Sequence, residues 1–284
     1  MDNIYVLGSI IFEQTTIVRD VGDVTTINHI GGKGFNIAKE FKNLGIDVHL
    51  YGVIANDALG NFLISQLNKF KINYLGPQVE GKTGIYQSIH NNGEMIFSSG
   101  DYRIYKNFYF DKLFAPSEIN NLYVLSTTLP EKQLIKISFM IKKFEKKSII
   151  CMCMASPHDW KKVVQCKGFI DILIGNKSEI NNLIDNFGGD KIKALNKLNI
   201  KTILITLGAK GVNLFDLASQ KVEEIRTKPI PRYNVISTVG AGDVFAAAFL
   251  YSYVLQKDNL KNSTLFAMKR ASMVVKSALP YLID

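Results

Sequence analysis

The sequence has few cysteines and no apolar run long enough to span a membrane. Its three cysteines, Cys151, Cys153 and Cys166, cannot all pair within one chain, and the first two are too close in a strand to bridge readily. We therefore expect a reducing compartment, the cytoplasm. The longest apolar runs, such as 149–155 and 244–251, are much shorter than the roughly 18 residues that cross a bilayer, so no membrane partner is expected.

The beginning of the sequence also lacks the features of an export signal. Asp2 stands where a secretory signal has basic residues, and Gly8, Ser9 and Glu13 interrupt the apolar segment early. This pattern agrees with a cytoplasmic protein.

Positive charge exceeds negative charge, since 34 Lys and Arg residues against 25 Asp and Glu residues give a net charge of +9. Such a charge allows nucleic acid, membrane surfaces or anionic small molecules as partners. The lysines, however, are scattered over expected outer helix faces, as in Lys142–Lys143 and Lys161–Lys162, without the interleaved aromatic residues of a base-stacking surface. We therefore expect a solvated surface and no specific nucleic-acid partner.

The pattern along the chain predicts an α/β fold. With 47% hydrophobic residues the chain of 284 residues can bury a large core, as one big domain or two modest ones. Short apolar runs rich in Val and Ile alternate with stretches of helical spacing, which indicates a mostly parallel central sheet flanked by helices. The expected strands cover 5–11, 48–54, 122–126, 148–154, 170–174 and 202–206, and the expected helices cover 34–44, 59–70, 131–144, 177–186 and 191–198.

Two segments depart from this alternation. Residues 83–97 alternate partly and turn at 91–93, which is a hairpin signal. The β-branched stretch 15–27, broken by Gly22, would pair with this hairpin in a small side sheet. Such a sheet either covers a site or decorates an edge of the fold.

The strongest local signal is a loop of small residues that enters a helix at 237–243. Gly240, Ala241 and Gly242 carry no side chain larger than a methyl group, so the free N–H groups of the helix start can close around an anion such as phosphate. Asp243 follows in the first turn, where it would accept the proton of a hydroxyl that attacks a phosphoryl group. The alternative is a plain helix cap with tight packing.

A second glycine-rich piece, Gly31-Gly32-Lys33-Gly34, also opens an expected helix. Asn36 in its first turn offers a donor and an acceptor, which matches a sugar hydroxyl. An ordinary turn and cap would show the same pattern.

Two further pieces follow neighbouring strands. Asn176 and Glu179 come directly after the 170–174 strand, at the edge where open α/β folds bind ligands, and they would suit a Mg²⁺ ion held through its water shell. An N-cap with a first-turn Glu is the alternative. The segment 206–211 leaves the next strand with two glycines, which suits either backbone contact with a nucleotide or a hairpin into 212–215.

One motif is a decoy. Residues 76–83 match the P-loop expression G-x-x-x-x-G-K-[ST], but a P-loop needs a helix directly after Thr83. The following residues, 84–89, read as an extended strand instead, so we reject a P-loop. The four histidines are dispersed, and no zinc site is predicted.

Taken in this order, the pieces resemble the ribokinase-like, or PfkB, family of carbohydrate kinases. Residues 31–38, continuing through 44–45 and 52–53 to 56–60, look like the first family signature, and 237–243 look like the second. Residues 176–179 resemble the N-x-x-E motif and 206–211 the nucleotide segment. The resemblance covers essentially the whole chain.

The resemblance implies a single ribokinase-like domain over 1–284, with a β-lid built from about 12–29 and 83–108. The implied activity is transfer of the γ-phosphoryl group of ATP to a hydroxyl of a small carbohydrate, with Mg²⁺. The implied catalytic residues are Asp243 as base and Gly240, Ala241 and Gly242 as anion hole. The implied substrate residues are Glu13, Gly32, Lys33, Asn36 and Asp243. The implied nucleotide residues are Asn176, Thr206, Gly208, Gly211, Thr238, Gly240 and Gly242, and Glu179 with Asn176 would hold Mg²⁺ through water.

The chain departs from the family pattern at a few positions. Ser237 replaces an Asp that contributes to a monovalent-cation site in relatives, which leaves K⁺ activation open. Ile11 replaces a polar residue and Glu13 is a longer acid than the usual Asp, while Thr127 and Thr128 stand near where ribokinase places a Glu against ribose. A sugar kinase is therefore the leading hypothesis. A nucleoside kinase and a catalytically silent sugar- or nucleotide-binding regulator are the alternatives, and an apolar outer face on the lid hairpin would permit a homodimer.

Overall fold

The computed structural model of the protein describes residues 1–18, 23–91, 94–110, 118–187, 191–217, 219 and 221–283. The chain forms two compact units. The first unit comprises Met1–Leu7 and Phe110–Lys228, and the second unit comprises Gly8–Tyr109 and Pro229–Asp284. The single-domain boundaries expected from the sequence stay a prediction.

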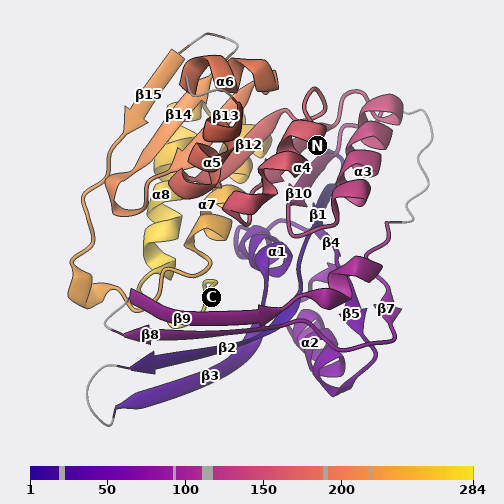
Figure 1. The fold of residues 1–284 in the computed structure, drawn as a ribbon, viewed down its shortest axis with the longest axis vertical. Coiled ribbons are helices and arrows are strands. Elements are labelled where there is room, and N and C mark those ends of the chain that lie inside the picture. The colour runs from indigo at the N-terminus through magenta and orange to yellow at the C-terminus, as the bar shows by residue number, and fades with distance from the viewer. Residues whose placement is uncertain are drawn as a thin grey trace. The chain divides into compact units, whose positions relative to one another are not determined.

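The first unit is built on a mostly parallel sheet (Figure 1). Its strands run in the order β15-β14-β13-β12-β11-β10-β1. The pairs from β1 through β13 are parallel, and the last two pairs, β13 with β14 and β14 with β15, are antiparallel. The strands are β1 (Ile4–Leu7), β10 (Leu122–Ser126), β11 (Ile149–Cys153), β12 (Ile172–Asn176), β13 (Thr202–Thr206), β14 (Val212–Asp216) and β15 (Lys221–Ile225). This arrangement confirms the predicted sheet.

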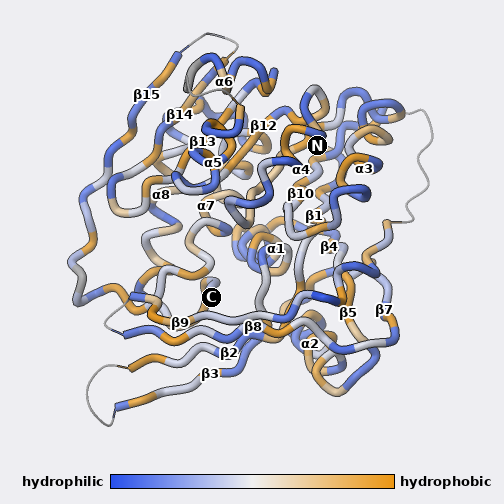
Figure 2. Tube along the Cα trace, in the orientation of Figure 1, coloured by the Kyte–Doolittle hydropathy of each residue, from blue (hydrophilic) through white to orange (hydrophobic). Residues whose placement is uncertain are grey.

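Four helices lie on one face of this sheet (Figure 1): α3 (Glu131–Phe144), α4 (Trp160–Gln165), α5 (Lys177–Phe187) and α6 (Lys191–Leu198). Helix α3 buries Leu134, Ile137 and Ile141, whose spacing of three and four residues places them on one stripe. The strands β12 and β13 carry continuous hydrophobic residues (Figure 2), as expected for strands covered on both faces. Short 3₁₀ helices at Pro157–Asp159 and Gly208–Lys210 complete this unit.

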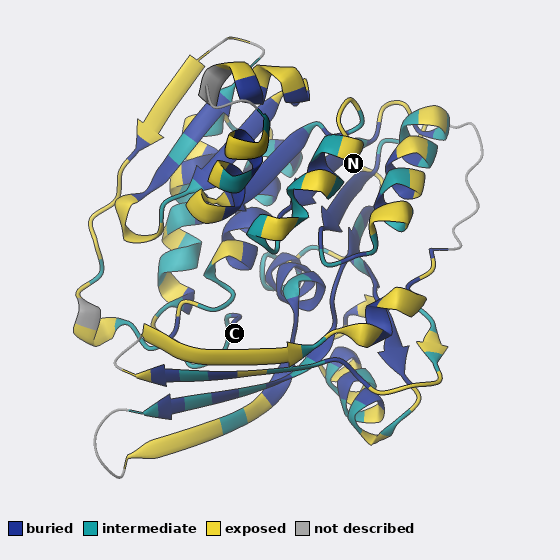
Figure 3. Ribbon diagram, viewed as in Figure 1, coloured by how far each residue is buried: buried dark blue, intermediate teal, exposed yellow. Residues whose placement is uncertain are grey.

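The second unit contains the small side sheet. This four-stranded sheet has the order β3-β2-β8-β9, with β2 (Ile11–Val18), β3 (Val24–Gly31), β8 (Ile85–Asn91) and β9 (Glu94–Asp101). The two segments that depart from the alternation therefore pair as predicted, while Gly22 and the turn residues 92–93 lie outside the described residues. The alternate residues Glu13, Thr15 and Ile17 of β2 are buried, whereas β9 is exposed almost along its whole length (Figure 3).

The helices of the second unit are α1 (Lys33–Asn43), α2 (Ala58–Lys69), α7 (Ala241–Leu250) and α8 (Leu260–Val274). Helix α7 packs against both α1 and α8, and the buried Glu40 of α1 accepts two hydrogen bonds, of 2.6 and 3.0 Å, from Arg270 of α8. The remaining elements are β4 (His49–Tyr51), β5 (Ile54–Ala55), β6 (Asn73–Tyr74), β7 (Gln78–Val79), a π-helical turn at Tyr251–Leu255, and 3₁₀ helices at Arg103–Asn107 and Arg232–Asn234.

Two predicted strands are interrupted. The expected strand 5–11 splits because β1 ends at Leu7 and β2 begins at Ile11, and the expected strand 48–54 splits into β4 and β5. Both breaks contain a glycine in close packing: Gly8 donates its N–H to the Tyr51 carbonyl at 3.0 Å, and a Cβ on Gly52 would lie 2.7 Å from the Ile10 side chain. Within the described ranges no helix is both long and apolar enough to cross a membrane.

Candidate active site

The residues singled out in the sequence divide between the two units. Those of the first unit are Asn176, Glu179, Thr206, Gly208 and Gly211; those of the second unit are Glu13, Gly32, Lys33, Asn36, Thr238, Gly240, Ala241, Gly242 and Asp243.

The start of helix α7 is shaped by Gly240. This residue caps the helix with a φ of 79°, and a Cβ at this position would overlap the carbonyl group of Pro280, so only glycine fits. Its carbonyl accepts the N–H groups of Asp243 and Val244 at 3.0 and 2.9 Å. Among the described residues the N–H of Gly242 has no backbone acceptor, and Gly242 is exposed. The first turn therefore presents a free donor at the positive end of the helix.

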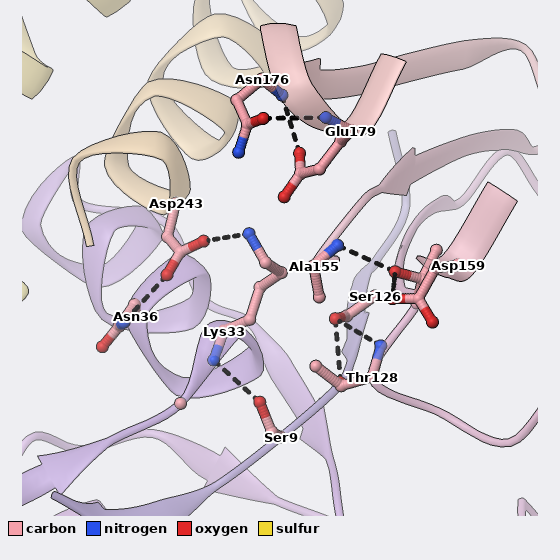
Figure 4. Close-up of polar contacts among 12 residues, drawn as sticks. Ser9, Lys33, Asn36, Ser126, Thr128, Ala155, Asp159, Asn176, Glu179 and Asp243 are labelled. Atoms are coloured by element: carbon pink, nitrogen blue, oxygen red, sulfur yellow. Dashed lines mark hydrogen bonds and ion pairs between the residues drawn. The ribbon is translucent and has the colours of Figure 1, made fainter. Parts of the chain in front are cut away.

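The carboxylate of Asp243 lies in this first turn and is 7% exposed. Lys33 Nζ donates to Oδ1 at 2.7 Å, and Asn36 Nδ2 donates to Oδ2 at 2.9 Å (Figure 4). The two donors precede Asp243 in the sequence by 210 and 207 residues. The fold of the second unit thus joins the two glycine-rich motifs into one polar cluster.

The amide group of Asn36 is only half satisfied. The residue is 2% exposed, and its Oδ1 has no hydrogen-bond partner among the described residues. A buried acceptor without a donor costs about 1–3 kcal/mol. A ligand hydroxyl that donates to this oxygen, beside Asp243, would remove that cost.

The turn that begins helix α1 is held by Ser9, which the sequence patterns did not assign to the site. Its Oγ accepts the N–H of Lys33 at 2.9 Å, and its carbonyl accepts the N–H of Phe35 at 3.1 Å. Gly32 caps the helix with a φ of 95°, where a Cβ would lie 2.6 Å from the Ser9 carbonyl oxygen. The only signal for Ser9 in the sequence is its place in the Gly8-Ser9 pair before β2.

Glu13, expected to contact the substrate, directs its carboxylate at the same turn. Oε1 accepts the N–H of Gly32 at 2.8 Å, whereas the buried Oε2 has no hydrogen-bond partner in the part of the chain that the structure describes. Burial raises the pKa of Glu13 to about 7; the Gly32 hydrogen bond opposes this shift, and the charge of Asp243 adds to it. Oε2 lies 4.0 Å from Nδ1 of His29, whose own pKa is lowered by burial.

In the first unit, Asn176 and Glu179 form a reciprocal cap at the start of helix α5. Asn176 Oδ1 accepts the N–H of Glu179 at 3.0 Å, and Glu179 Oε2 accepts the N–H of Asn176 at 2.7 Å (Figure 4). This is a capping box, the structural alternative expected for the pattern. Asn176 is exposed and lies opposite Thr206 in the ladder between β12 and β13, so the structure brings these two predicted residues side by side.

The donor set around Asn176 and Glu179 fits a magnesium ion held through water. In the described part of the chain no group of three or more His, Cys, Asp or Glu residues is arranged to hold a metal ion directly. One carboxylate and one amide oxygen suit Mg²⁺, because this ion keeps several of its water molecules when it binds to proteins.

The segment after β13 forms a tight hairpin into β14. Gly208 and Gly211 have φ values of 59° and 112°, and the N–H of Leu207 donates to the Gly211 carbonyl at 2.8 Å. A Cβ on Gly211 would overlap the Ile225 carbonyl, whereas a Cβ on Gly208 would meet nothing within 4 Å. Gly211 is therefore required by packing, and the exposed Gly208 leaves its backbone open to contact.

Two positions that depart from the family pattern use their hydroxyl groups internally. Thr127 Oγ1 donates to Asp159 Oδ2 at 2.8 Å and accepts the N–H of Ala155 at 2.9 Å. Ser237 Oγ accepts the N–H of Val239 at 3.2 Å. Both residues are buried; Thr127 connects the end of β10 to the segment after β11, whereas Ser237 stabilises a local turn.

The rejection of a P-loop at 76–83 is confirmed. Thr83 donates its N–H and its hydroxyl to the carboxylate of Asp57, at 2.9 and 2.5 Å, and strand β8 follows instead of a helix. Asp57 also caps helix α2 through the N–H of Gly60 at 2.7 Å. Thr83, the last residue of the P-loop-like sequence, therefore binds the carboxylate that caps helix α2.

Comparison with known proteins shows the family. The model of the pfkB family carbohydrate kinases matches residues 1–282. The chain is 24% identical over 281 residues to a 5-dehydro-2-deoxygluconokinase of Mesomycoplasma hyopneumoniae, covering 88% of this chain and 79% of that protein, and 26% identical over 270 residues to a ribokinase of Arabidopsis thaliana, covering 89% and 69%. The structure of a carbohydrate kinase from Agrobacterium tumefaciens matches with a TM-score of 0.75 at 21% identity, over 99% of this chain and 93% of that one. The fold is ribokinase-like, and the chain belongs to the pfkB family of carbohydrate kinases, which makes it an ATP-dependent phosphotransferase.

Proposed function

We propose that this kinase transfers the γ-phosphoryl group of ATP to a hydroxyl of a small carbohydrate, with Asp243 as the general base. The observation that carries the proposal is the position of the Asp243 carboxylate. It lies in the first turn of α7, close in sequence to the free N–H of Gly242, and it is held by Lys33 and Asn36.

The reaction uses these groups as follows. An oxygen of Asp243 accepts the proton of the substrate hydroxyl while the hydroxyl oxygen forms a bond to the γ-phosphorus. The bond between this phosphorus and the β,γ-bridging oxygen breaks, and ADP leaves with the electron pair. The N–H groups at Gly240, Ala241 and Gly242 stabilise the negative charge on the transferred group, and Lys33 offsets the charge of the base.

The remaining roles follow from the donors and acceptors of each residue. On the substrate side, the unpartnered Oδ1 of Asn36 accepts from a substrate hydroxyl, and Gly32 and Lys33 line the same turn. When bound, Mg²⁺ neutralises phosphate charge, and Glu179 and Asn176 would hold it through water. We assign the nucleotide contacts from the resemblance to the family: Asn176, Thr206, Gly208 and Gly211 of the first unit, and Thr238, Gly240 and Gly242 of the second unit.

The variant Asp243→Asn tests the base. It keeps the size of the side chain but cannot accept the hydroxyl proton, so we expect kcat to fall roughly 10²–10⁴-fold with a much smaller change in KM. ADP formation with the accepted substrate is the measurement. The variant Glu223→Gln, an exposed carboxylate on β15, is the matched control and should keep the activity of the wild type. An Asp243→Asn enzyme that keeps most of its kcat would remove Asp243 from this role.

A nucleoside substrate is the second candidate, and Ile11 favours it. Ile11 is 2% exposed and would lie 2.8 Å from a Cβ placed on Gly84, so an apolar group stands at the start of β2 where a sugar site would use a polar one. A panel of ribose, fructose, 5-dehydro-2-deoxygluconate, adenosine and pseudouridine with Mg·ATP separates the candidates. Ligand binding without ADP formation on any of them would indicate a catalytically silent regulator.

A further inference from the structure

The side chain of Glu13 reaches from strand β2 across the end of strand β3. In the ladder Glu13 pairs with His29, and its carboxyl group lies over the glycine pair 31–32. A Cβ on Gly31 would overlap the carboxyl carbon of Glu13. The N–H of Gly32 donates to Oε1 at 2.8 Å. The side chain therefore fills the space that glycine leaves and also satisfies the backbone of the turn.

The carboxyl group of Glu13 is almost fully buried against the turn. Glu13 is 4% exposed, Oε1 is taken by Gly32, and Oε2 is fully buried. Burial lowers the pKa of the His29 imidazole that faces Oε2, and the hydrogen bond from its Nδ1 to the Ile30 carbonyl, at 2.9 Å, opposes this shift. The contacts of the Glu13 carboxyl group with the turn are those of a hydrogen-bond acceptor and of a packed group.

We propose that Glu13 is a positioning residue: it holds the Gly31–Gly32 turn in the conformation from which Lys33 and Asn36 reach Asp243. The chain reverses at Gly32 with a φ of 95°, and helix α1 begins at the next residue. A shift of this turn would move the first turn of α1, which carries both partners of the Asp243 carboxylate. The inference rests on the proposed function for the catalytic role of Asp243 and its two partners. The stabilisation of the Gly31–Gly32 turn by Glu13 does not depend on that function.

The proposed role needs a hydrogen-bond acceptor at the right distance but does not need a negative charge. The kcat of the Glu13 variants should therefore depend on whether the acceptor is kept. Glu13→Gln keeps the acceptor and the volume, so we expect its kcat within about threefold of the wild type. Glu13→Ala removes both, and we expect kcat to fall at least about 30-fold while KM for ATP changes little, since a misplaced base costs rate more than nucleotide binding. Gln14→Ala, on the opposite face of the same strand, is the matched control.

The variant Gly31→Ala makes the test independent of how Glu13→Ala folds. In the wild-type background the new methyl group displaces the Glu13 carboxyl group, so we expect a loss similar to that of Glu13→Ala. In the Glu13→Ala background the space is free, so the second substitution should add almost nothing. Such non-additivity is the signature of two groups that compete for one position.

The exchange rate of the Gly32 amide hydrogen, measured by NMR, shows whether Glu13 still accepts this N–H, and the measurement needs no substrate. We expect protection in the wild type and in Glu13→Gln, and at least about tenfold faster exchange in Glu13→Ala and Gly31→Ala. Equal loss of kcat in Glu13→Gln and Glu13→Ala would overturn the inference, as would unchanged Gly32 exchange in Gly31→Ala. A wild-type protein that phosphorylates nothing in the panel would refute the proposed function alone, because the exchange measurement still decides the role of Glu13.

Discussion

At the scale of single residues, the second unit places two carboxylates in opposite circumstances. Asp243 has a lysine and an amide as donors, whereas Glu13 is more deeply buried and has one backbone N–H. A carboxylate out of water with a single donor is poorly compensated, because burial disfavours its charged form. The unfavourable desolvation of a carboxylate therefore falls on Glu13, which contacts the turn, and not on Asp243, the proposed base.

This cost predicts how stability depends on pH. Titratable groups around Glu13 are His29, Asp243, Tyr102 and Tyr281. The pKa of Glu13 is raised from 4.5 to about 7, so between these values the folded state binds a proton that the unfolded state has lost. The contribution of Glu13 to the free energy of unfolding is therefore fully present below pH 4.5 and is lost as the pH rises through about 7. The ceiling of this loss is about 3 kcal/mol, at 1.36 kcal/mol per pKa unit.

Urea denaturation of the wild type and of Glu13→Gln at pH 5 and pH 8 measures this contribution. The difference between the two proteins isolates Glu13, because the shift of His29 acts in the opposite direction and is common to both. We expect the glutamine variant to gain stability relative to the wild type by about 2–3 kcal/mol between pH 5 and pH 8. A difference that does not change with pH would mean that Glu13 titrates near its ordinary value.

Single-residue roles were only partly predictable from the sequence. The resemblance pointed to Lys33, Asn36 and Asp243, and the structure joins them in one cluster. It gave no reason to single out Ser9 as a support of the turn, and it did not indicate the hydrogen bond that Glu13 accepts from the Gly32 backbone. The substrate contact that it implied for Glu13 stays a prediction. Motif spacing identifies residue types, but which atom a side chain meets depends on how strands and turns approach in space.

At the scale of elements, helices α5 and α7 differ in how the first N–H groups of the helix, which have no acceptor inside it, find partners. Helix α5 satisfies its first N–H groups with the side chains of Asn176 and Glu179. Helix α7 has no side-chain cap, because its cap residue is Gly240, and the N–H of Gly242 is left without a backbone acceptor within the described ranges. A helix start without a side-chain cap leaves its donors to a ligand.

This difference predicts contrasting effects of two similar substitutions in one loop. Gly240→Ala forces a positive φ on alanine and a clash with the Pro280 carbonyl, so we expect a loss of at least about 2 kcal/mol of stability. Gly242→Ala meets nothing within 4 Å and lies inside the helix, so stability should stay the same or rise by up to about 1 kcal/mol.

Thermal denaturation and ADP formation distinguish the two variants. We expect Gly242→Ala to keep its Tm but to lose at least about tenfold in kcat, since the methyl group narrows the space in front of the free N–H. A fully active Gly242→Ala enzyme would exclude this donor from phosphate binding.

The elements themselves were largely predictable. Strands β10 and β13 and helices α3 and α6 have the bounds that periodicity indicates. The failures at 5–11 and 48–54 occur where Gly8 and Gly52 allow other segments to pack against the backbone. Hydrophobic patterns do not carry information on such long-range approaches.

At the scale of the whole molecule, the small sheet ends in an edge strand with exposed apolar side chains. Strand β9 is the last in its sheet, and Met95, Ile96 and Phe97 are 49%, 62% and 52% exposed. An unpaired edge with such residues favours pairing with another chain. We propose a second copy of this chain as the partner, consistent with the homodimer expected from the lid hairpin.

Sedimentation velocity of the full chain tests this proposal. We expect a dimer for the wild type at micromolar concentration and a monomer for Ile96→Lys, because a charge in the centre of the interface must be desolvated. Val222→Lys makes the same change at a 54% exposed position on β15 and should leave the dimer intact. A wild-type protein that sediments as a monomer at all concentrations would exclude the edge of the small sheet as a dimer contact.

The two hydrogen bonds that Asp243 accepts have a consequence for the choice between an alcohol and water as the phosphoryl acceptor. Because both oxygens of this carboxylate already accept hydrogen bonds, from Lys33 and from Asn36, we expect it to bind a single water molecule weakly. An alcohol can take over one of these bonds only when the rest of the substrate is bound beside it. On the proposed mechanism, the same pair of donors that orients the base also limits the wasteful hydrolysis of ATP when no acceptor is present.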